Sequence, residues 1–281
     1  MPELPEVEVL ARHLERTLPG KTIREVKVHR AKILRPTPER TLRTALTGAT
    51  FKAVWRRGKY LIFELSTRGQ PLQLLGHLGM TGRMFLALKK SPIPKHAAVV
   101  LDLGRTHFIF EDTRYFGRLS LDLAAVKKLG PEPLGRAFTP EPLGRELKRS
   151  RQAIKVKLLD QSLVACVGNI YASEALFRAR IPPQKAANRL QPEQVKRLHG
   201  TIREVLSEAI KLGSTLPVNF SGAKSDGLFY FGRAPGAPDY YEERLRVYDR
   251  AGKPCLECGT PIRRIVQAAR STYFCPLCQK V

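Results

Sequence analysis

The first residues of the chain place one nucleophile beside two acids. If Met1 is removed, Pro2 becomes the N-terminus and offers an exposed secondary amine. A terminal α-amine has a pKa of about 7.7–8.0, against about 10.4 for lysine, so a useful fraction is neutral near pH 7. Such an amine can attack an aldehyde-level carbon and form a Schiff base. Glu3 and Glu6 supply two carboxylates close by, as general acid–base catalysis requires.

The same residues also fit an ordinary chain terminus. A helix start often carries a proline in its first turn and acidic residues that favour the positive end of the helix dipole. The N-terminal residues alone therefore leave both readings open.

Four of the five cysteines form two C-x-x-C pairs, Cys255 with Cys258 and Cys275 with Cys278, separated by sixteen residues. Two such pairs complete a tetrahedral site of four thiolates, which favours zinc over a redox C-x-x-C. With every ligand position filled by the protein, one Zn²⁺ here is structural. Cys166 is the odd cysteine, and we expect a small buried side chain.

The residues between the two pairs predict a β-hairpin clipped by the metal. Residues 262–274 have strand character on both sides of 267–270, which puts Arg270 near the tip. Together with Arg263 and Arg264, this arginine could enter a groove or brace a phosphate.

Composition narrows the class of partner. Lys and Arg number 49 against 25 Asp and Glu, a net charge of +24. A chain this basic most often meets a polyanion, with nucleic acid first, although a solvated basic surface or a ribosomal type of protein is the alternative. No apolar run approaches the roughly 20 residues that a membrane-spanning helix needs, and no signal peptide is visible. We therefore expect a cytoplasmic protein with no membrane partner.

The spacing of apolar residues along the chain predicts the helices and strands. Residues 6–18 predict a helix, and from about 21 to 122 short alternating segments separated by turns predict an antiparallel β-sandwich or barrel. These segments are 23–28, 51–55, 60–65, 72–75, 83–88, 97–103, 107–110 and 117–121. Helices are then expected at 140–148 after a Thr139 cap, and at 154–159, 170–179 and 192–212.

These elements predict an α+β multi-domain protein in four parts. Residues 1–130 form the N-terminal helix and β-sandwich, and 131–144 a linker rich in proline and glycine. Residues 145–244 form a helical domain with a long loop at 213–241, and 245–281 the zinc-finger hairpin. A loop of that length in a compact domain is usually functional or disordered.

Several ordered motifs in this chain resemble the formamidopyrimidine-DNA glycosylases, bacterial base-excision-repair enzymes of the helix–two-turn–helix superfamily. They are Met1–Glu8, Gly58–Leu61, His77–Gly82, Asp112–Gly117, Leu129–Leu134, Val167–Glu174 and the paired cysteines. The resemblance covers essentially the whole chain. It implies a helix–two-turn–helix DNA-binding domain in the helical part.

The resemblance also implies roles for individual residues. Pro2 would attack C1′ of the damaged nucleotide, Glu3 would protonate the sugar ring oxygen, and Glu6 would help to hold the terminus. Lys59 would contact a phosphate and assist elimination, and His77 would contact a phosphate. Without the resemblance, Lys59 would be an ordinary turn lysine and His77 a satisfied histidine.

The resemblance implies further DNA contacts beyond those of Lys59 and His77. Met80, Arg114 and Phe116 match residues that fill the void left by an extruded base. Met80 is an adaptable side chain that can fill space, Arg114 has several hydrogen-bond donors for the orphaned base, and Phe116 is an apolar wedge that can unstack a base step. From their residue types alone, Met80 and Phe116 would be core residues. Lys155 and Asn169 would touch phosphate or lesion, and Arg270 would grip phosphates beside it.

Two features depart from the family pattern. Cys166 stands where glycine is usual, which we expect to alter packing only. The stretch 214–220 replaces a Thr-Leu-Arg-Asp type of sequence, and the following loop, up to 249, is longer. That loop caps the extruded base in relatives. We therefore expect the altered loop to affect which damaged bases the protein accepts.

The sequence therefore predicts a monomeric bifunctional DNA glycosylase and apurinic/apyrimidinic lyase for oxidised purines such as 8-oxoguanine. Damaged double-stranded DNA would run through a basic cleft between the sandwich and the helical domain of a bacterial protein associated with the nucleoid. One alternative is the endonuclease VIII type, which favours oxidised pyrimidines; Leu4 and Met80 argue against it. The other is a zinc-containing protein that binds damaged DNA without catalysis.

Overall fold

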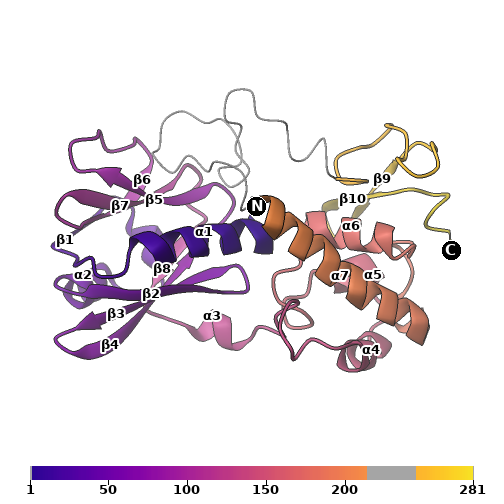
Figure 1. The fold of residues 1–281 in the computed structure, drawn as a ribbon, viewed down its shortest axis with the longest axis horizontal. Helices are drawn as coiled ribbons and strands as arrows, with labels where there is room; N and C mark the ends of the chain where they lie inside the picture. Colours follow the sequence, from indigo (N-terminus) through magenta and orange to yellow (C-terminus); the bar gives the residue numbers. More distant parts are fainter. Residues whose placement is uncertain (1, 214–244, 281) are drawn as a thin grey trace. The chain divides into compact units, whose positions relative to one another are not determined.

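The structure, a computed structural model, describes residues 2–213 and 245–280. The chain divides into two compact units: of the described residues, 2–127 and 212–213 belong to the first, and 128–211 and 245–280 to the second. Figure 1 shows their helices and strands. The first contains the N-terminal helix and the β-sheets, and the second contains most of the helices and the C-terminal hairpin. Together they confirm the α+β class.

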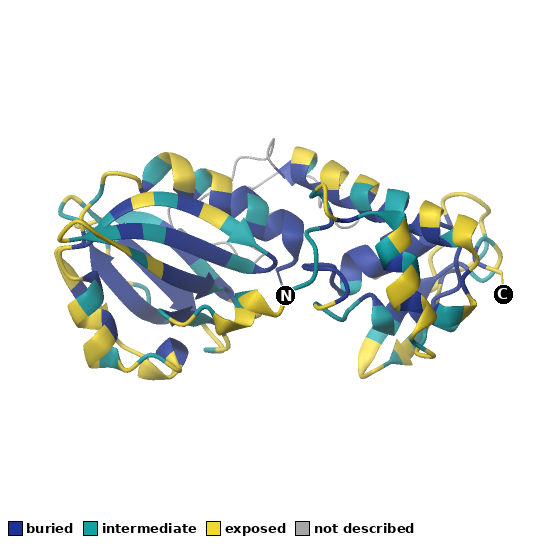
Figure 2. Cartoon of the chain, turned by 90° about the horizontal axis from the view of Figure 1, so that it is seen from below, coloured by how far each residue is buried: buried dark blue, intermediate teal, exposed yellow. Residues whose placement is uncertain are grey.

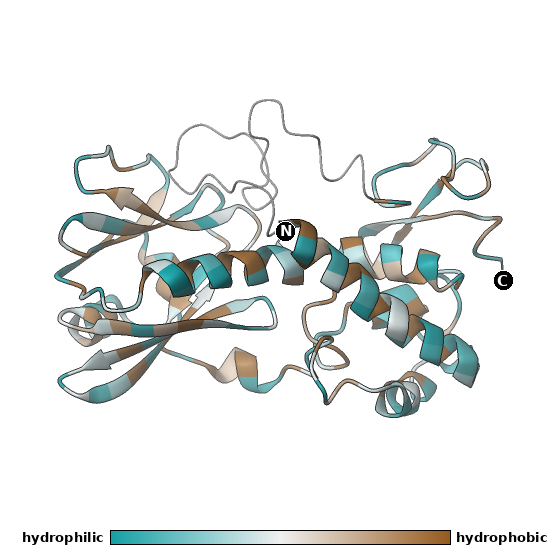
Figure 3. Ribbon diagram, viewed as in Figure 1, coloured by the Kyte–Doolittle hydropathy of each residue, from teal (hydrophilic) through white to brown (hydrophobic). Residues whose placement is uncertain are grey.

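Helix α1 (Leu4–Thr17) begins two residues before the predicted start. Its buried positions Val7, Leu10 and Leu14 recur at helical spacing and form an apolar stripe. Figure 3 shows brown and teal segments alternating along this helix. A capping box starts the helix: the Glu3 carboxylate accepts the Glu6 N–H, and Oε2 of Glu6 accepts the Glu3 N–H at 2.9 Å. This box satisfies amides that a helix start otherwise leaves without partners.

The predicted sandwich consists of two four-stranded antiparallel sheets. One has the order β1 (Glu25–Val28), β6 (Ala97–Asp102), β7 (Thr106–Asp112), β5 (Gly82–Leu88). The other has the order β2 (Thr50–Arg57), β3 (Tyr60–Thr67), β4 (Gln70–His77), β8 (Arg118–Ser120). All eight predicted strands are confirmed.

Aromatic rings join the two sheets. Phe108 of β7 meets Phe51 and Phe63 of the other sheet edge to face, with ring centroids 6.2 and 5.6 Å apart. All three side chains are buried, and Figure 2 shows the buried residues concentrated along the strands. This aromatic core makes the sandwich a rigid base for the loops at the strand ends.

The β-rich region also contains helices that the sequence analysis missed. A 3₁₀ turn, η1 (Ala31–Leu34), and helix α2 (Glu39–Leu46) follow β1, and α3 (Ala124–Lys127) follows β8. Helix α2 buries Leu42 and Leu46, one turn apart. Two buried leucines in eight residues are too short a pattern to separate from a strand.

The second unit matches the predicted helices closely. They are α4 (Pro140–Lys148), α5 (Ile154–Lys157), α6 (Asn169–Arg178) and α7 (Pro192–Gly213), with a 3₁₀ turn η2 (Ala187–Arg189). Thr139 occupies the N-cap position of α4, but its side chain makes no capping hydrogen bond, so that detail of the prediction was wrong. Helix α4 starts within the segment expected as a linker.

The C-terminal hairpin pairs β9 (Arg263–Gln267) with β10 (Arg270–Phe274). Its two turn residues, Ala268 and Ala269, have φ of 46° and 59°, as a type I′ turn requires. Cys255, Ile262, Tyr273 and Cys275 pack with Phe177 of α6 and Val247 in a small core. Within residues 2–213 and 245–280, none of the helices has the length and apolar character of a membrane span.

Candidate functional site

The N-terminal site residues lie together at the start of α1. The capping box buries Glu3 and Glu6, which are 2% and 0% exposed. Pro2 is buried as well, in a chain that still carries Met1, so the exposed imino group of the mature chain stays a prediction. Met1 lies outside the described residues.

Lys59 sits in the two-residue turn of the β2–β3 hairpin. Arg57 pairs with Tyr60, which leaves Gly58 and Lys59 as the turn. Gly58 has φ of +58°, a conformation that glycine adopts without the steric cost of a Cβ atom. Lys59 is only 9% exposed. The turn therefore holds the lysine in a defined place.

Strand register brings His77 next to this hairpin. His77 pairs with Tyr60 across β3 and β4, and with Arg118 across β4 and β8. Burial, together with the positive charges of Lys59 and Arg118, lowers its pKa to about 4. Its Nδ1 accepts the N–H of Gly79 at 3.1 Å, which assigns the proton to Nε2. A neutral imidazole with an Nε2–H donor can bind a phosphate oxygen.

Met80, Arg114 and Phe116 are exposed on two adjacent loops. The exposed fractions of Met80 and Phe116 are 41% and 48%, which excludes the core position that residue type alone suggests. The Arg114 guanidinium lies 4.8 Å from the centroid of the Phe116 ring. These two apolar side chains and Arg114 are therefore open to solvent and available to a partner.

The two loops are fixed by residues whose roles the sequence analysis missed. Asp112, fully buried, accepts the Thr81 hydroxyl, the Arg114 amide and the Gly117 amide at 2.6, 3.2 and 2.8 Å. A Cβ atom on Gly79 would lie 2.6 Å from the Gly117 nitrogen, so the loops pack backbone to backbone. The signal was present, because Asp112 and Gly79 belong to the motifs quoted for the resemblance.

In the second unit, the structure brings Lys155 and Asn169 together. The Lys155 ammonium donates to Oδ1 of Asn169 at the start of α6. The Asn169 amide donates to the Ser271 carbonyl of β10 at 3.0 Å. Lys155 is fully buried, so it lies deeper than a surface phosphate contact would suggest. Asn169 thus links α5, α6 and the hairpin.

Arg270 is exposed and is the first residue of β10, directly after the turn. Arg263 and Arg264 are exposed on β9, and Nε of Arg264 donates to the Ser271 hydroxyl at 3.0 Å. The hairpin therefore presents three cations to solvent, as the sequence predicts.

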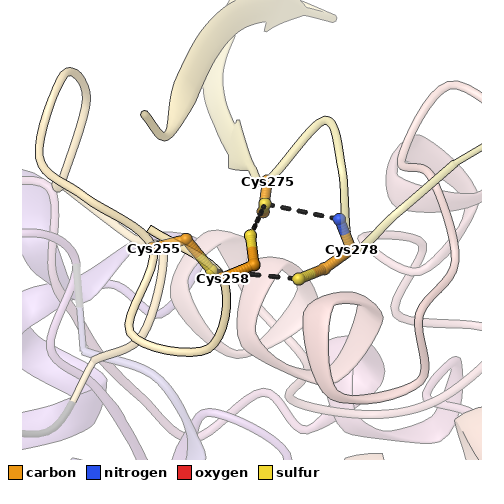
Figure 4. Close-up of side chains that lie close together, drawn as sticks. All are labelled: Cys255, Cys258, Cys275 and Cys278. Carbon is orange, nitrogen blue, oxygen red and sulfur yellow. Dashed lines mark hydrogen bonds between the residues drawn. The ribbon is translucent and has the colours of Figure 1, made fainter. Parts of the chain in front are cut away.

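The four paired cysteines converge, as Figure 4 shows. Their sulfur atoms all lie within 4.8 Å of one another, with Cys258 to Cys275 at 3.4 Å and Cys255 to Cys278 at 3.9 Å. A tetrahedron with Zn–S bonds of about 2.3 Å has edges of roughly 3.8 Å. Hydrogen bonding to Thr260 lowers the pKa of Cys258 to about 6, whereas burial raises the pKa of Cys275 and Cys278, so it is the geometry of the four sulfur atoms that supports a metal site. These residues can hold one structural zinc ion.

Two further residues shape the second unit. Cys166 is buried as expected, but its φ is +70° and the Val167 amide donates to the Ala165 carbonyl, so the backbone makes a γ-turn here. Glu174 of α6, 2% exposed, accepts three backbone N–H groups from residues 246–248, at 2.9, 3.0 and 2.9 Å. The long loop expected at 213–241 lies, after Gly213, outside the described residues.

Family models match three segments of the chain. The formamidopyrimidine-DNA glycosylase N-terminal domain matches residues 1–119, and its H2TH domain matches residues 129–219. A zinc finger found in FPG and IleRS matches residues 252–281.

Named relatives and solved structures agree with these matches. The formamidopyrimidine-DNA glycosylase of Desulfitobacterium hafniense is 40% identical over 99% of this chain and 100% of its own. That of Thermus thermophilus is 42% identical over 99% and 98%. The Lactococcus lactis Fpg in complex with DNA containing an abasic site has a TM-score of 0.87 and 35% identity, with both chains fully covered. Its complex with N7-benzyl-Fapy-dG DNA has a TM-score of 0.86 and 36% identity over the same coverage.

Proposed function

The chain belongs to the formamidopyrimidine-DNA glycosylase family, and from this premise we propose that Pro2 is the nucleophile and Glu3 the acid of its reaction. The protein is a DNA glycosylase of oxidised-purine repair, and apurinic/apyrimidinic lyase activity is typical of its family. The observation that carries the residue assignment is the Glu3–Glu6 capping box, which fixes the residue next to Pro2 at the first turn of α1.

The first step exchanges one C–N bond for another. The Pro2 nitrogen bonds to C1′ as the glycosidic bond breaks, and the base leaves with a proton from solvent. Glu3 gives a proton to the ring oxygen, the C1′–O4′ bond opens, and the nitrogen loses its own proton to form an iminium. Glu6 holds the Glu3 amide in place at 2.9 Å.

Two eliminations then cut the strand. Loss of a C2′ proton expels the 3′ phosphate, and loss of the C4′ proton expels the 5′ phosphate. Lys59 contacts a phosphate at the lesion and assists these steps, and the Nε2–H of His77 binds a phosphate oxygen. The strand pairing of Tyr60 with His77 supports this assignment, because it sets Lys59 beside the imidazole.

Base extrusion is assigned to the exposed side chains of Met80, Arg114 and Phe116. Phe116 opens the base step, Met80 fills the space, and Arg114 hydrogen-bonds the orphaned base. Their exposure and the contact between Arg114 and Phe116 support these roles. Extruding a paired base costs a few kcal/mol, and side chains that occupy the gap offset part of that cost.

In the second unit, Asn169 and Arg270 are assigned to DNA, and the buried Lys155 acts there through its hydrogen bond to Asn169. Asn169 is the first residue of α6, and a helix start offers N–H groups to phosphate. We assign residues 1–130 to catalysis, 145–244 to DNA binding and 245–281 to the zinc finger, with 131–144 as the linker. The partner is damaged double-stranded DNA, bound by a monomer in the bacterial cytoplasm at the nucleoid.

The test is borohydride trapping on a duplex with 8-oxoguanine opposite cytosine. The mature protein should form a covalent adduct with DNA and cleave the strand. Glu3→Gln should lose about 10²-fold or more in cleavage rate, as expected for loss of an acid. Pro2→Gly replaces the secondary amine with a primary amine, so it should cleave more slowly but still form some adduct. A matched protein extended by one residue before Pro2, which makes its nitrogen an amide, should form no adduct.

The competing assignments give different results in the same assay. Preferential cleavage of thymine glycol would indicate the endonuclease VIII type. Binding without an adduct, with loss of Met1 proven by mass spectrometry, would indicate a non-catalytic protein. Unchanged cleavage after acetylation of the Pro2 nitrogen would reject the mechanism.

A further inference from the structure

We propose that Arg56 and Glu8 are positioning residues that tie the Lys59 hairpin to α1, the helix that begins beside Pro2 and Glu3. This inference rests on the role proposed above for Lys59. It assigns a function to a side-chain pair that needs no contact with DNA.

The tie consists of one guanidinium held between two elements. Nε of Arg56 donates to Oε2 of Glu8 on α1 at 2.7 Å. Nη1 of the same group donates to the carbonyl of Gly58 at 2.9 Å. The Arg56 side chain is 8% exposed and that of Glu8 21%, so water screens the contact little. A single rigid group therefore connects the helix to the turn.

The hydrogen bond from Arg56 to the Gly58 carbonyl acts on the residue next to Lys59. Gly58 directly precedes Lys59 and is the turn residue with positive φ. A two-residue turn has few internal contacts of its own, so a hydrogen bond to its carbonyl sets the orientation of the peptide that leads into Lys59. Arginine suits this task because its planar fork presents several donors in fixed directions.

Glu8 is itself held from two sides. Its other oxygen, Oε1, accepts Nε of Arg12, one turn further along α1, at 2.8 Å. Burial raises the pKa of Glu8, but hydrogen bonds and charge from Arg56 and Arg12 outweigh it and lower the pKa overall. Glu8 therefore stays ionised at neutral pH, and the tie remains charged on both sides.

The consequence is a fixed relation between the N-terminal amine and the lysine. Catalysis needs reacting groups placed to within a fraction of an ångström, and a displacement of about 1 Å can cost roughly 10²-fold in rate. Without the tie, α1 and the hairpin keep their packing but lose the contact that sets the turn. The loss should appear in the elimination that Lys59 assists.

The experiment is a double-mutant cycle between Arg56 and Lys59. Arg56→Lys keeps the positive charge but cannot reach Glu8 and Gly58 together. Single-turnover cleavage of a duplex with a preformed abasic site is measured with Lys59 present and in a Lys59→Ala background. We expect Arg56→Lys to slow cleavage about tenfold with Lys59 present and less than about twofold without it, the non-additivity that coupled residues show.

Two further variants sharpen the test. Glu8→Gln keeps the side-chain length but removes the charge, and it should give a smaller loss that also depends on Lys59. Arg43→Lys is the matched control, since Arg43 pairs with Glu39 on α2 at 2.8 Å and should leave the rate unchanged. Melting temperatures of all variants separate loss of folding from loss of rate.

Each outcome is decisive. Equal losses in both backgrounds would make Arg56 a structural residue only and overturn the inference. An unchanged rate in Arg56→Lys would do the same, and so would a fully active Lys59→Ala protein. A wild-type protein that traps no DNA would instead reject the proposed function, which keeps the two failures distinct.

Discussion

Thr81 donates its hydroxyl to Oδ1 of Asp112 at 2.6 Å, and this bond joins the loop of Met80 to the loop of Arg114 and Phe116. The other oxygen of Asp112 accepts the Gly117 amide at 2.8 Å. One buried carboxylate thus sets the relative position of the two loops. In the role proposed for Met80, Arg114 and Phe116, the loops that carry them are therefore preorganised before DNA binds.

We predict that Thr81→Val slows excision of 8-oxoguanine from a duplex about tenfold and lowers stability by about 1 kcal/mol, because the buried Oδ1 of Asp112 loses one of its two donors and keeps only the Arg114 amide. Cleavage at a preformed abasic site, where no base is extruded, should change little. Single-turnover rates on the two duplexes check this. Thr113→Val is the control, because Thr113 is an exposed threonine of the loop that carries Arg114 and Phe116. Equal slowing on both substrates would contradict a role in extrusion.

Stability should depend on pH through His77. Burial and the charges of Lys59 and Arg118 lower its pKa from 6.5 to about 4. The unfolded chain therefore takes up this proton first, and stability is lost as pH falls from 6.5 through 4. His77→Gln should flatten that part of the curve of melting temperature against pH. Parallel curves for the two proteins would show that His77 is not the titrating group.

Removal of zinc should affect the two units differently. Trp55 of β2 is the only tryptophan in the chain, so its fluorescence reports the sandwich alone. After chelation we expect binding to a duplex with an abasic-site analogue to weaken about tenfold or more, since metal binding supplies folding energy to small sites. The unfolding midpoint seen by Trp55 should stay unchanged. A lower midpoint would show that the metal stabilises the whole chain.

Cys166 offers a test of backbone strain. Cys166→Gly and Cys166→Ala both remove the sulfur, but only glycine adopts φ of +70° without strain. We expect the glycine variant to be more stable than the alanine variant by about 1 kcal/mol, the reverse of their order in a helix. Chemical denaturation measures the difference. Greater stability of the alanine variant would contradict the γ-turn.

Much of this fold could be predicted from the sequence because its signals are local. Alternating residues located all eight strands of the sandwich, and cysteine spacing located the metal site. Short helices such as α2 gave too little pattern. The spacing of Val7, Leu10 and Leu14 identified α1, but the burial of Pro2 depends on packing that spacing does not report.

The candidate site needed more than local signals. The types of Met80 and Phe116 suggest burial, and only the fold shows both exposed. The Thr81–Asp112 bond joins residues 31 positions apart, and the Arg56–Glu8 bond joins residues 48 apart. Periodicity cannot indicate such pairs, because it reports which face a residue occupies and not which partner it meets.

The carboxylate of Glu174 has a consequence for how this chain can evolve. It fixes residues 246–248 on α6, where the described chain resumes after Gly213. Insertions or deletions before that point therefore leave the register of the zinc hairpin untouched. The arginine-bearing hairpin therefore has an anchor on α6 that does not depend on the length of the chain that comes before Leu245.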